Sequence, residues 1–461
     1  LNANQKKAVD AIEGCVMVVA GPGTGKTQVL GARVAKILQE TDVKPNNILC
    51  LTFTDAATVA LRNRLNQFIG AEAYRVGIYT YHAFCNMVIQ ENKDVFGIQD
   101  LEPLSELEEA ELLKEIIDVL PNTSPLKRFG YDEYYERRNL KQVFDFMDKE
   151  DYSLERLQLE VERVLLENVN DEKNYYVRNV RNYKKGDFKQ KQYDELKAAL
   201  DKLLEAASYK AVYDTKKLDR GRYSYNDMIN WVVEKFTTNA NLLANYQEQY
   251  QYVLVDEYQD TNGIQNHLLQ LLISYWDNPN VFLVGDDDQS IYKFQGANVE
   301  NILSFYKKYQ EYAQLIVLQE NYRSSQSILD GSNYVVSKNL ERLVGRIPSL
   351  DKNIVAANAE VSHLPNGIKQ VEYNSLYDEA YGITQKIQEL LNAGVPGNEI
   401  AVLYAKHAQA EILMSQLQHA SIDYNVTRSQ NVLETKIIQQ LLLYLHYFQL
   451  EFEKYQSGDH L

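Results

Sequence analysis

The feature that most constrains this fold is a glycine-rich run, Ala20-Gly21-Pro22-Gly23-Thr24-Gly25-Lys26-Thr27. It follows the apolar run Val16 to Ala20 and opens an amphipathic stretch, Lys26 to Gln39. This strand–loop–helix setting is typical of a phosphate-binding P-loop, here with Ala20 in place of the first glycine. Glycines let backbone N–H groups curl around phosphate oxygens, and the helix N-terminus adds partial positive charge. The setting disfavours the alternative, a glycine-rich turn without a ligand.

The P-loop predicts a nucleotide and a metal ion as ligands. We expect Lys26 to reach the β- and γ-phosphates and the Thr27 hydroxyl to ligate Mg²⁺. Such a site also needs a carboxylate on the metal and another that orients water. Asp256 and Glu257 follow an apolar run directly, and α/β sheets place their ligands at strand ends. Asp256 is therefore expected to bind Mg²⁺ and Glu257 to polarise the attacking water, although two such acids alone could also cap a helix.

A third apolar run, Val281 to Val284, ends in Gly285-Asp286-Asp287-Asp288-Gln289-Ser290. Three adjacent acids are costly to place together unless a cation or a basic partner is near. Gln289 is long enough to bond both a γ-phosphate and a moving neighbour. Taken alone, the segment favours a solvated acidic turn.

Short apolar runs alternate with helical patterns along much of the chain. Strands are predicted at residues 16–20, 47–53, 77–80, 252–256, 281–285 and 315–318. Helices are predicted at residues 26–39, 55–69 and 81–90. This alternation indicates the α/β class, with a parallel sheet and crossover helices.

The strand pattern stops between residues 91 and 223, where long, charged segments have a helical period. A second α/β pattern follows, with strands expected at 368–373 and 400–404 and helices at 376–392, 408–420 and 431–450. Two strands cannot close a sheet of normal size, so this part looks incomplete. The domain limits are predicted as a first sheet domain, 1–90 plus 224–318; an inserted helical domain, 91–223; a partial second sheet domain, 319–430; and the start of a further helical insertion, 431–461.

The charge balance argues at first against a nucleic-acid partner, because the net charge is −16 and phosphates are repelled by an acidic surface. One segment, Lys173 to Lys191, has the opposite balance. It holds seven basic residues against the single acid Asp187, with Tyr and Phe interleaved. A solvated basic face and a contact to DNA phosphates are equally good interpretations of it.

The rest of the composition excludes little. No apolar run reaches the roughly 18 residues that a membrane span needs, so no membrane partner is expected. The three cysteines, Cys15, Cys50 and Cys85, lie in or beside apolar stretches and are interpreted as buried thiols in a reducing cytoplasm.

Together these motifs resemble the UvrD/Rep/PcrA family of superfamily 1 DNA helicases. The order and spacing of the motifs fit that family, and the segments that carry the likeness are Leu1-Asn2 with Gln5, the P-loop, Leu51-Thr52-Phe53-Thr54, Tyr79-Thr80-Tyr81-His82, Asp256-Glu257-Tyr258-Gln259-Asp260-Thr261, Gly285 to Gly296, Gln319-Glu320-Asn321-Tyr322-Arg323-Ser324 and Ile400-Ala401-Val402-Leu403-Tyr404. The resemblance implies a RecA-like ATPase domain with a helical insertion, followed by part of a second RecA-like domain.

The resemblance also implies roles for single residues. Gln5 would read the adenine of ATP and Tyr322 would stack on it. Arg323 would be an arginine finger, a group worth ~10³–10⁵ in rate, and Gln289 would couple the γ-phosphate to the grip on DNA. Residues implied to contact DNA are Phe53, Tyr292 and Phe294 by base stacking, and Thr80 and His82 along the strand path.

Some positions depart from the family pattern. Phe294 stands where Trp is usual, Gln295 and Gln28 replace common arginines, and Asp55-Ala56 replaces an Asn-Lys pair beside the DNA path. These departures weaken the expected affinity for DNA rather than the ATP site. No later arginine or histidine motif of the second motor domain is recognised after Arg323, because Arg342, Arg346 and Arg428 lie in unrelated contexts. We therefore expect the chain to be part of a longer motor.

The sequence thus predicts an ATP-hydrolysing, Mg²⁺-dependent DNA helicase that travels 3′-to-5′ on single-stranded DNA and unwinds duplex DNA. DNA-repair or replication proteins are expected partners. The nearest alternative is the motor portion of a RecB- or AddA-like helicase–nuclease. A P-loop phosphotransferase and a non-hydrolysing DNA scaffold fit less well, since the first does not explain Arg323 and the second does not explain an intact Lys26 and Glu257.

Overall fold

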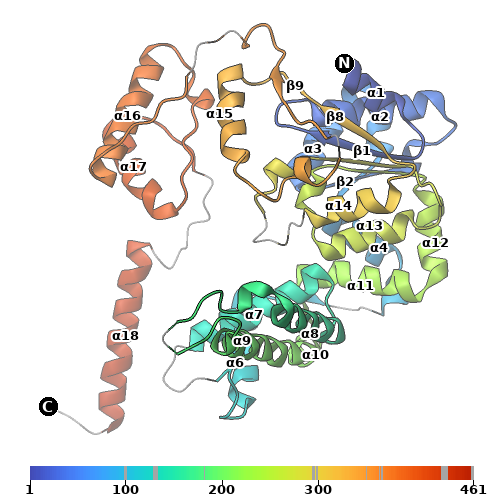
Figure 1. Ribbon diagram of the computed structural model, residues 1–461. Coiled ribbons are helices and arrows are strands. Elements are labelled where there is room, and N and C mark those ends of the chain that lie inside the picture. The colour runs from blue at the N-terminus through green and yellow to red at the C-terminus, as the bar shows by residue number, and fades with distance from the viewer. Residues whose placement is uncertain are drawn as a thin grey trace. The chain divides into compact units, whose positions relative to one another are not determined.

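The computed structural model describes residues 1–97, 101–127, 133–180, 182–292, 296, 299–348, 350–362, 364, 367–426 and 435–457 (Figure 1). The chain forms two compact units, Leu1–Gly367 and Ile368–Leu461. All predicted nucleotide-site residues fall in the first unit, and of the motif segments only residues 400–404 lie in the second.

A six-stranded sheet forms the centre of the first unit. Its strands lie in the order β3 (Gly77–Thr80), β2 (Ile48–Thr52), β6 (Tyr252–Val255), β7 (Val281–Gly285), β1 (Cys15–Ala20) and β8 (Gln314–Leu318). All neighbouring strands are parallel. Each predicted strand of this sheet forms, with ends within one residue of the expected ones, and the α/β class is confirmed. The four inner strands are buried along their whole length, as expected for a parallel sheet covered on both faces.

Helices cover both faces of the sheet. One face packs on α1 (Ala3–Asp10), α2 (Lys26–Glu40) and α3 (Asp55–Ile69), and its core includes Val29, Leu30 and Leu61. The other face packs on α4 (Tyr81–Glu91), α11 (Tyr225–Thr238), α12 (Ala240–Gln249), α13 (Gly263–Ile273) and α14 (Glu300–Tyr309). The predicted helices at residues 26–39, 55–69 and 81–90 are therefore confirmed.

The segment between α4 and α11 is helical, as the sequence predicts. It contains α5 (Lys93–Phe96), α6 (Glu106–Val119), α7 (Glu133–Glu150), α8 (Leu154–Asn170), α9 (Gln190–Ser208) and α10 (Lys210–Asp219). Its core includes Leu113, Ile116 and Phe144. A short parallel pair, β4 (Glu102–Pro103) with β5 (Arg222–Tyr223), joins the two ends of the insertion.

The chain after β8 forms a separate two-stranded sheet and a helix. It forms β9 (Glu320–Asn321), α15 (Gln326–Val336) and β10 (Val355–Ala356), and β10 pairs with β9 in parallel. In this segment Asn321 lies beside the loop that follows β1, and Arg342 and Lys352 lie beside the loop that follows β7.

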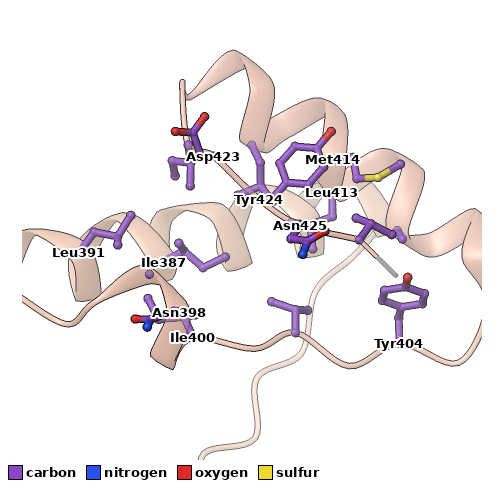
Figure 2. A pocket seen from close by; sticks show the side chains of 16 residues that line it. Ile387, Leu391, Asn398, Ile400, Tyr404, Leu413, Met414, Asp423, Tyr424 and Asn425 are labelled. Atoms are coloured by element: carbon purple, nitrogen blue, oxygen red, sulfur yellow. The ribbon is translucent and has the colours of Figure 1, made fainter. Parts of the chain in front are cut away.

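The second unit holds α16 (Leu376–Asn392), α17 (His407–His419) and α18 (Lys436–Ser457), close to the predicted helices. The strands expected at 368–373 and 400–404 are wrong: both segments lie within the described range 367–426, and neither forms a strand there. A strand needs a neighbouring backbone to pair with, whereas Leu403 is 95% exposed. Ile400 and Val402 instead pack on the core of α16 and α17 and line an apolar hollow of about 550 Å³ (Figure 2).

No helix among the described residues is long and apolar enough to cross a lipid bilayer.

Candidate nucleotide-binding site

The residues predicted to bind the phosphates and the metal gather at one edge of the sheet. The loops after β6, β7, β1 and β8 carry them, and these four strands are consecutive neighbours in the sheet. Since the carboxyl ends of parallel strands meet at the same edge, four segments far apart in sequence come together there.

The P-loop has the backbone that its glycines predict. Gly23 and Gly25 have φ of +67° and +85°, in the left-handed region that favours glycine. The Thr24 hydroxyl donates to the Gly21 carbonyl at 2.8 Å and is buried, which fixes the turn. Lys26 and Thr27 then begin α2, so the free N–H groups of a helix N-terminus face the same space. This is the geometry that a phosphate ligand requires.

Lys26 and Glu257 form an ion pair across this edge, with Lys26 Nζ 2.5 Å from Glu257 Oε2. Glu257 has φ of +49°, a strained value for a residue with a side chain. Its backbone N–H donates to Asp256 Oδ1 at 3.0 Å. The P-loop lysine and the two acids after β6 therefore lie together, as the sequence predicts they must for nucleotide chemistry.

The acids at this edge outnumber the cations. Asp256 and Asp260 are buried beside Glu257, and burial together with the charge of Glu257 raises the pKa of each to about 6. Asp260 Oδ1 has no hydrogen-bond partner among the described residues. Three carboxylates therefore face the single ammonium of Lys26, an excess that a divalent cation would neutralise. Asp260 was not predicted, although it belongs to the segment Asp256 to Thr261 that carried the resemblance.

The first helix is tied to the P-loop through Gln5. Its side-chain N–H donates to the Thr24 carbonyl at 2.9 Å, while its Oε1 accepts from Asn2 N at 2.9 Å. Asn2 in turn donates to the Tyr322 hydroxyl at 2.9 Å. Gln5 and Tyr322, the two residues implied to contact adenine, are therefore neighbours at one side of the P-loop.

The segment with Arg323 lies directly on the P-loop. The Tyr322 N–H donates to the Gly23 carbonyl at 2.9 Å, and the Asn321 side chain donates to the Pro22 carbonyl at 2.5 Å. A Cβ atom on Gly23 would lie 2.8 Å from the Arg323 Cβ. Arg323 is exposed, and its backbone N–H donates to Asn321 Oδ1 at 2.8 Å, so its main chain is held beside the P-loop.

The acidic turn after β7 is buried, and its interpretation as a solvated turn is wrong. Lys352 Nζ lies 2.6, 2.5 and 2.7 Å from carboxylate oxygens of Asp286, Asp287 and Asp288. The side chains of Lys352, Asp286 and Asp287 are no more than 3% exposed. Burial lowers the pKa of Lys352, but the three carboxylates outweigh it and hold that pKa above its ordinary value. A lysine therefore takes the place of the cation that three acids require.

Arg342 completes this cluster, a role that the sequence analysis did not predict. Its guanidinium donates to both oxygens of Asp288, at 2.7 and 2.8 Å. The Leu343 N–H also donates to Asp287 Oδ2 at 2.8 Å. The three adjacent acids indicate that a basic partner is needed. The sequence does not identify Arg342 as that partner, because 54 residues separate it from Asp288.

A chain of hydrogen bonds links this cluster to the ion pair at the P-loop. Gln259 donates to Glu257 Oε2 at 2.9 Å and accepts from Asp286 N at 2.9 Å. Gln289 donates to Asp286 Oδ2 at 2.7 Å. A displacement of the acidic turn would therefore move Glu257, because the buried side chain of Gln259 bonds to both.

The residues implied to contact DNA are only partly brought together. The rings of Phe53 and Tyr292 are 5.5 Å apart, and both are half-buried. Thr80 caps α4, with its hydroxyl accepting from Ala83 N at 3.2 Å. Burial lowers the pKa of His82, whose ring lies edge-on to Tyr225. Phe294 lies outside the described residues.

The comparisons with known proteins cover nearly the whole chain. The sequence profile of the UvrD/REP helicase N-terminal domain matches residues 1–310, and that of the UvrD-like helicase C-terminal domain matches residues 316–456. The chain is 30% identical over 455 residues to ATP-dependent DNA helicase PcrA of Staphylococcus aureus, an alignment that covers 96% of this chain and 53% of that protein. The PcrA of Staphylococcus epidermidis gives 30% identity over 453 residues, with the same coverage. The chain thus spans about half the length of the curated relatives it matches.

We predict that Lys352→Met lowers the free energy of unfolding by about 3–5 kcal/mol, because it leaves the buried carboxylates of Asp286 and Asp287 without their cation. The loss should shrink as pH falls. Carboxylates without a cation have a pKa in the folded chain above that in the unfolded chain, so the folded variant gains stability as it takes up protons. Urea unfolding at several pH values measures both effects, with the exposed Lys307→Met as the control. A loss no larger than that of the control would contradict the structural role of Lys352.

The raised pKa of Asp256 predicts a pH dependence for metal binding. Protons compete with Mg²⁺ for that carboxylate, so Mg²⁺-dependent nucleotide binding should weaken as pH falls below about 6. In the metal-free protein a fall in pH has the opposite effect, since it raises the stability of the fold. The pKa of Asp256 in the folded chain exceeds the ordinary 3.8, so protonation of Asp256 adds to the free energy of unfolding as pH falls through 6. Calorimetric titration of a nucleotide with and without Mg²⁺ at about pH 7.5 and about pH 5.5 separates the metal effect from protonation of the nucleotide. Equal Mg²⁺ dependence at both values would speak against Asp256 as the metal ligand.

Proposed function

The chain belongs to the UvrD/REP helicase family, and from that premise we propose that it is an ATP-hydrolysing motor that acts on DNA. The observation that carries the proposal is the meeting of four loops at one sheet edge, with Lys26 2.5 Å from Glu257 and the Arg323 segment bonded to the P-loop. ATP, Mg²⁺ and single-stranded and duplex DNA are the proposed ligands. The relatives' printed name, ATP-dependent DNA helicase, supports them.

The residues present fit a nucleotide with Mg²⁺. Gly23 and Gly25 give the P-loop the left-handed backbone of a phosphate-binding turn, and the excess of buried acids around Asp256 calls for a cation. Asp256 and Thr27 would hold the metal, and the P-loop N–H groups and Lys26 would hold the phosphates. When bound, Mg²⁺ supplies charge neutralisation on the phosphate oxygens.

Lys26 has to exchange partners for the site to work. In the absence of a nucleotide its ammonium lies 2.5 Å from Glu257 Oε2 and occupies the carboxylate oxygen that a water would need. A γ-phosphate would draw Lys26 away and free the carboxylate. The hydrogen bond from Gln259 would keep Glu257 in place to orient the water and accept its proton. Hydrolysis would thus start only once a nucleotide has displaced the lysine.

Arg323 and Gln289 would connect hydrolysis to movement. Arg323 would stabilise charge on the γ-phosphate from the segment that leaves the sheet after β8. Gln289 would act through Asp286 and Gln259, since its side chain bonds to Asp286. Phe53 and Tyr292, whose rings lie 5.5 Å apart and are tilted by 35°, would offer faces to bases without sequence preference. Travel in the 3′-to-5′ direction is proposed on the resemblance alone.

We predict that Lys26→Ala lowers the rate of ATP hydrolysis at least about 100-fold, because one charged donor to the reacting phosphate is lost. The exposed Lys7→Ala is the matched control. A coupled assay of phosphate release, with circular dichroism as the check on folding, measures the loss. Turnover within twofold of the unaltered chain would rule out the assigned site.

We also predict that single-stranded DNA raises the hydrolysis rate of the unaltered chain. DNA bound at Phe53 and Tyr292 would shift the turn after β7, and this shift would change the position of Glu257. The same assay with and without an oligonucleotide tests this. A rate indifferent to DNA, but raised by a small phosphate acceptor, would favour a phosphotransferase instead.

A further inference from the structure

Arg33 of α2 is a buried cation that lies outside the loops of the nucleotide-binding site. The residue is 1% exposed. Burial lowers the pKa of Arg33 to about 9, so its guanidinium is still a cation at neutral pH. Among the described residues it bonds to backbone carbonyls rather than to a carboxylate. A buried charge without an ionic partner is costly, so the contacts of this side chain call for an explanation.

The guanidinium of Arg33 closes the carboxyl end of α1, which lies beside α2 (Figure 1). It donates to the carbonyls of Ala8, at 2.9 Å, of Ala11, and of Ile12, at 3.1 Å. Carbonyls at the end of a helix have no N–H partner within it, and a cation there complements the helix dipole. The guanidinium also lies over the ring of Phe282 in β7, 4.4 Å from its centre. Arg33 therefore fastens α1 to both α2 and the sheet.

The same helix carries Gln5, whose side chain contacts the P-loop. Gln5 Nε2 donates to the Thr24 carbonyl at 2.9 Å and lies 3.0 Å from the place that a Cβ atom on Gly25 would occupy. Gln5 lies three residues before Ala8, so the two share one face of the helix, and both are buried. One helical turn therefore joins a carbonyl held by Arg33 to the amide at the P-loop.

The helix α1 is too short to keep this position by itself. It has eight residues, and helices of fewer than about 12–15 residues are marginal without tertiary contacts. Its buried apolar residues are Ala8 and Val9, which anchor it by a small area. Lys36, also on α2, lies 2.9 Å from Asp10 of α1, but both are partly exposed and such pairs contribute little. The bonds from Arg33 are therefore the main polar anchor of the carboxyl end of α1.

The orientation of the Gln5 amide decides which base it can bond. One N–H is used by the Thr24 carbonyl, and one lone pair of the oxygen accepts from Asn2 N. The second N–H and the second lone pair match adenine, which offers an acceptor at N7 and a donor at its 6-amino group. Guanine has the acceptor O6 in place of that donor. A correctly held Gln5 would therefore favour adenine, and a shifted one would lose the preference.

We propose that Arg33 is a positioning residue for the nucleotide base, which acts by holding α1 so that the amide of Gln5 faces adenine. The inference rests on the proposed function, in which ATP binds at the P-loop. It adds that selection of the base depends on a buried cation at the far end of the helix that carries Gln5. A structural role alone would lower stability without a preference among ligands.

The test separates binding of the base from binding of the phosphates. Calorimetric titration of the full chain with Mg²⁺ measures the affinity for ADP, GDP and inorganic tripolyphosphate. In Arg33→Met, ADP affinity should fall at least about tenfold, tripolyphosphate affinity should change less than about threefold, and the preference for ADP over GDP should shrink at least about fivefold, as the loss of hydrogen bonds to the base requires. In ATP hydrolysis, KM should rise at least about tenfold and kcat should stay within about threefold.

Three variants serve as controls. Gln5→Ala removes the group through which Arg33 acts, so adding Arg33→Met to it should lower ADP affinity by less than a further threefold or so. Lys36→Met removes the other cation of α2 that reaches α1 and should leave all three affinities within about twofold. Arg33→Lys keeps a cation but loses the planar fork, and it should show the same split between ADP and tripolyphosphate at a smaller size, at least about threefold for ADP. This variant decides the matter if Arg33→Met does not fold.

The proposal is overturned if the Arg33 variants weaken ADP and tripolyphosphate equally, if they leave ADP binding unchanged, or if their effect is undiminished beside Gln5→Ala. An unaltered chain that binds tripolyphosphate without preferring ADP to GDP would overturn it as well, and would leave the P-loop assignment intact. An unaltered chain that binds none of the three would overturn the proposed function itself, and this inference with it.

Discussion

The ion pair between Lys26 and Glu257 is the interaction on which the candidate site depends. It joins the loop after β1 to the loop after β6, and it holds both side chains where a terminal phosphate and its attacking water would meet. The pair stays satisfied without a nucleotide, so the acidic edge can exist in the free protein. We propose that the terminal phosphate of a nucleotide takes the lysine from Glu257. The same contact would then both satisfy the empty site and release the carboxylate for its proposed role.

The sheet and its edge were predictable because their signals are local. Each inner strand is a continuous apolar run. A P-loop is recognised in a sequence by glycines that must adopt positive φ, as Gly23 and Gly25 do. Asp256 and Glu257 follow from the strand before them. Parallel strands then bring these loops to one edge whatever their separation in sequence.

Partners far away in sequence were not predictable. The three acids after β7 signalled a missing cation, but no pattern marks Lys352, which lies in an irregular segment and is buried only because the acids surround it. Arg342 was set aside for the same reason. The strands expected at 368–373 and 400–404 were wrong for another reason. An apolar pattern indicates which side chains are buried, but it does not show whether a neighbouring strand is present to pair with. The domain limits and the roles given to single site residues stay predictions.

The central claim is that Lys26 moves from Glu257 to the terminal phosphate when a nucleotide binds. A crystal structure of the chain with Mg²⁺ and a non-hydrolysable ATP analogue tests it most directly. The account predicts Lys26 Nζ against a γ-phosphate oxygen, Asp256 facing the metal, and Glu257 still bonded to Gln259 with a water between it and the phosphate. A nucleotide bound elsewhere, with the Lys26–Glu257 pair intact, would contradict it.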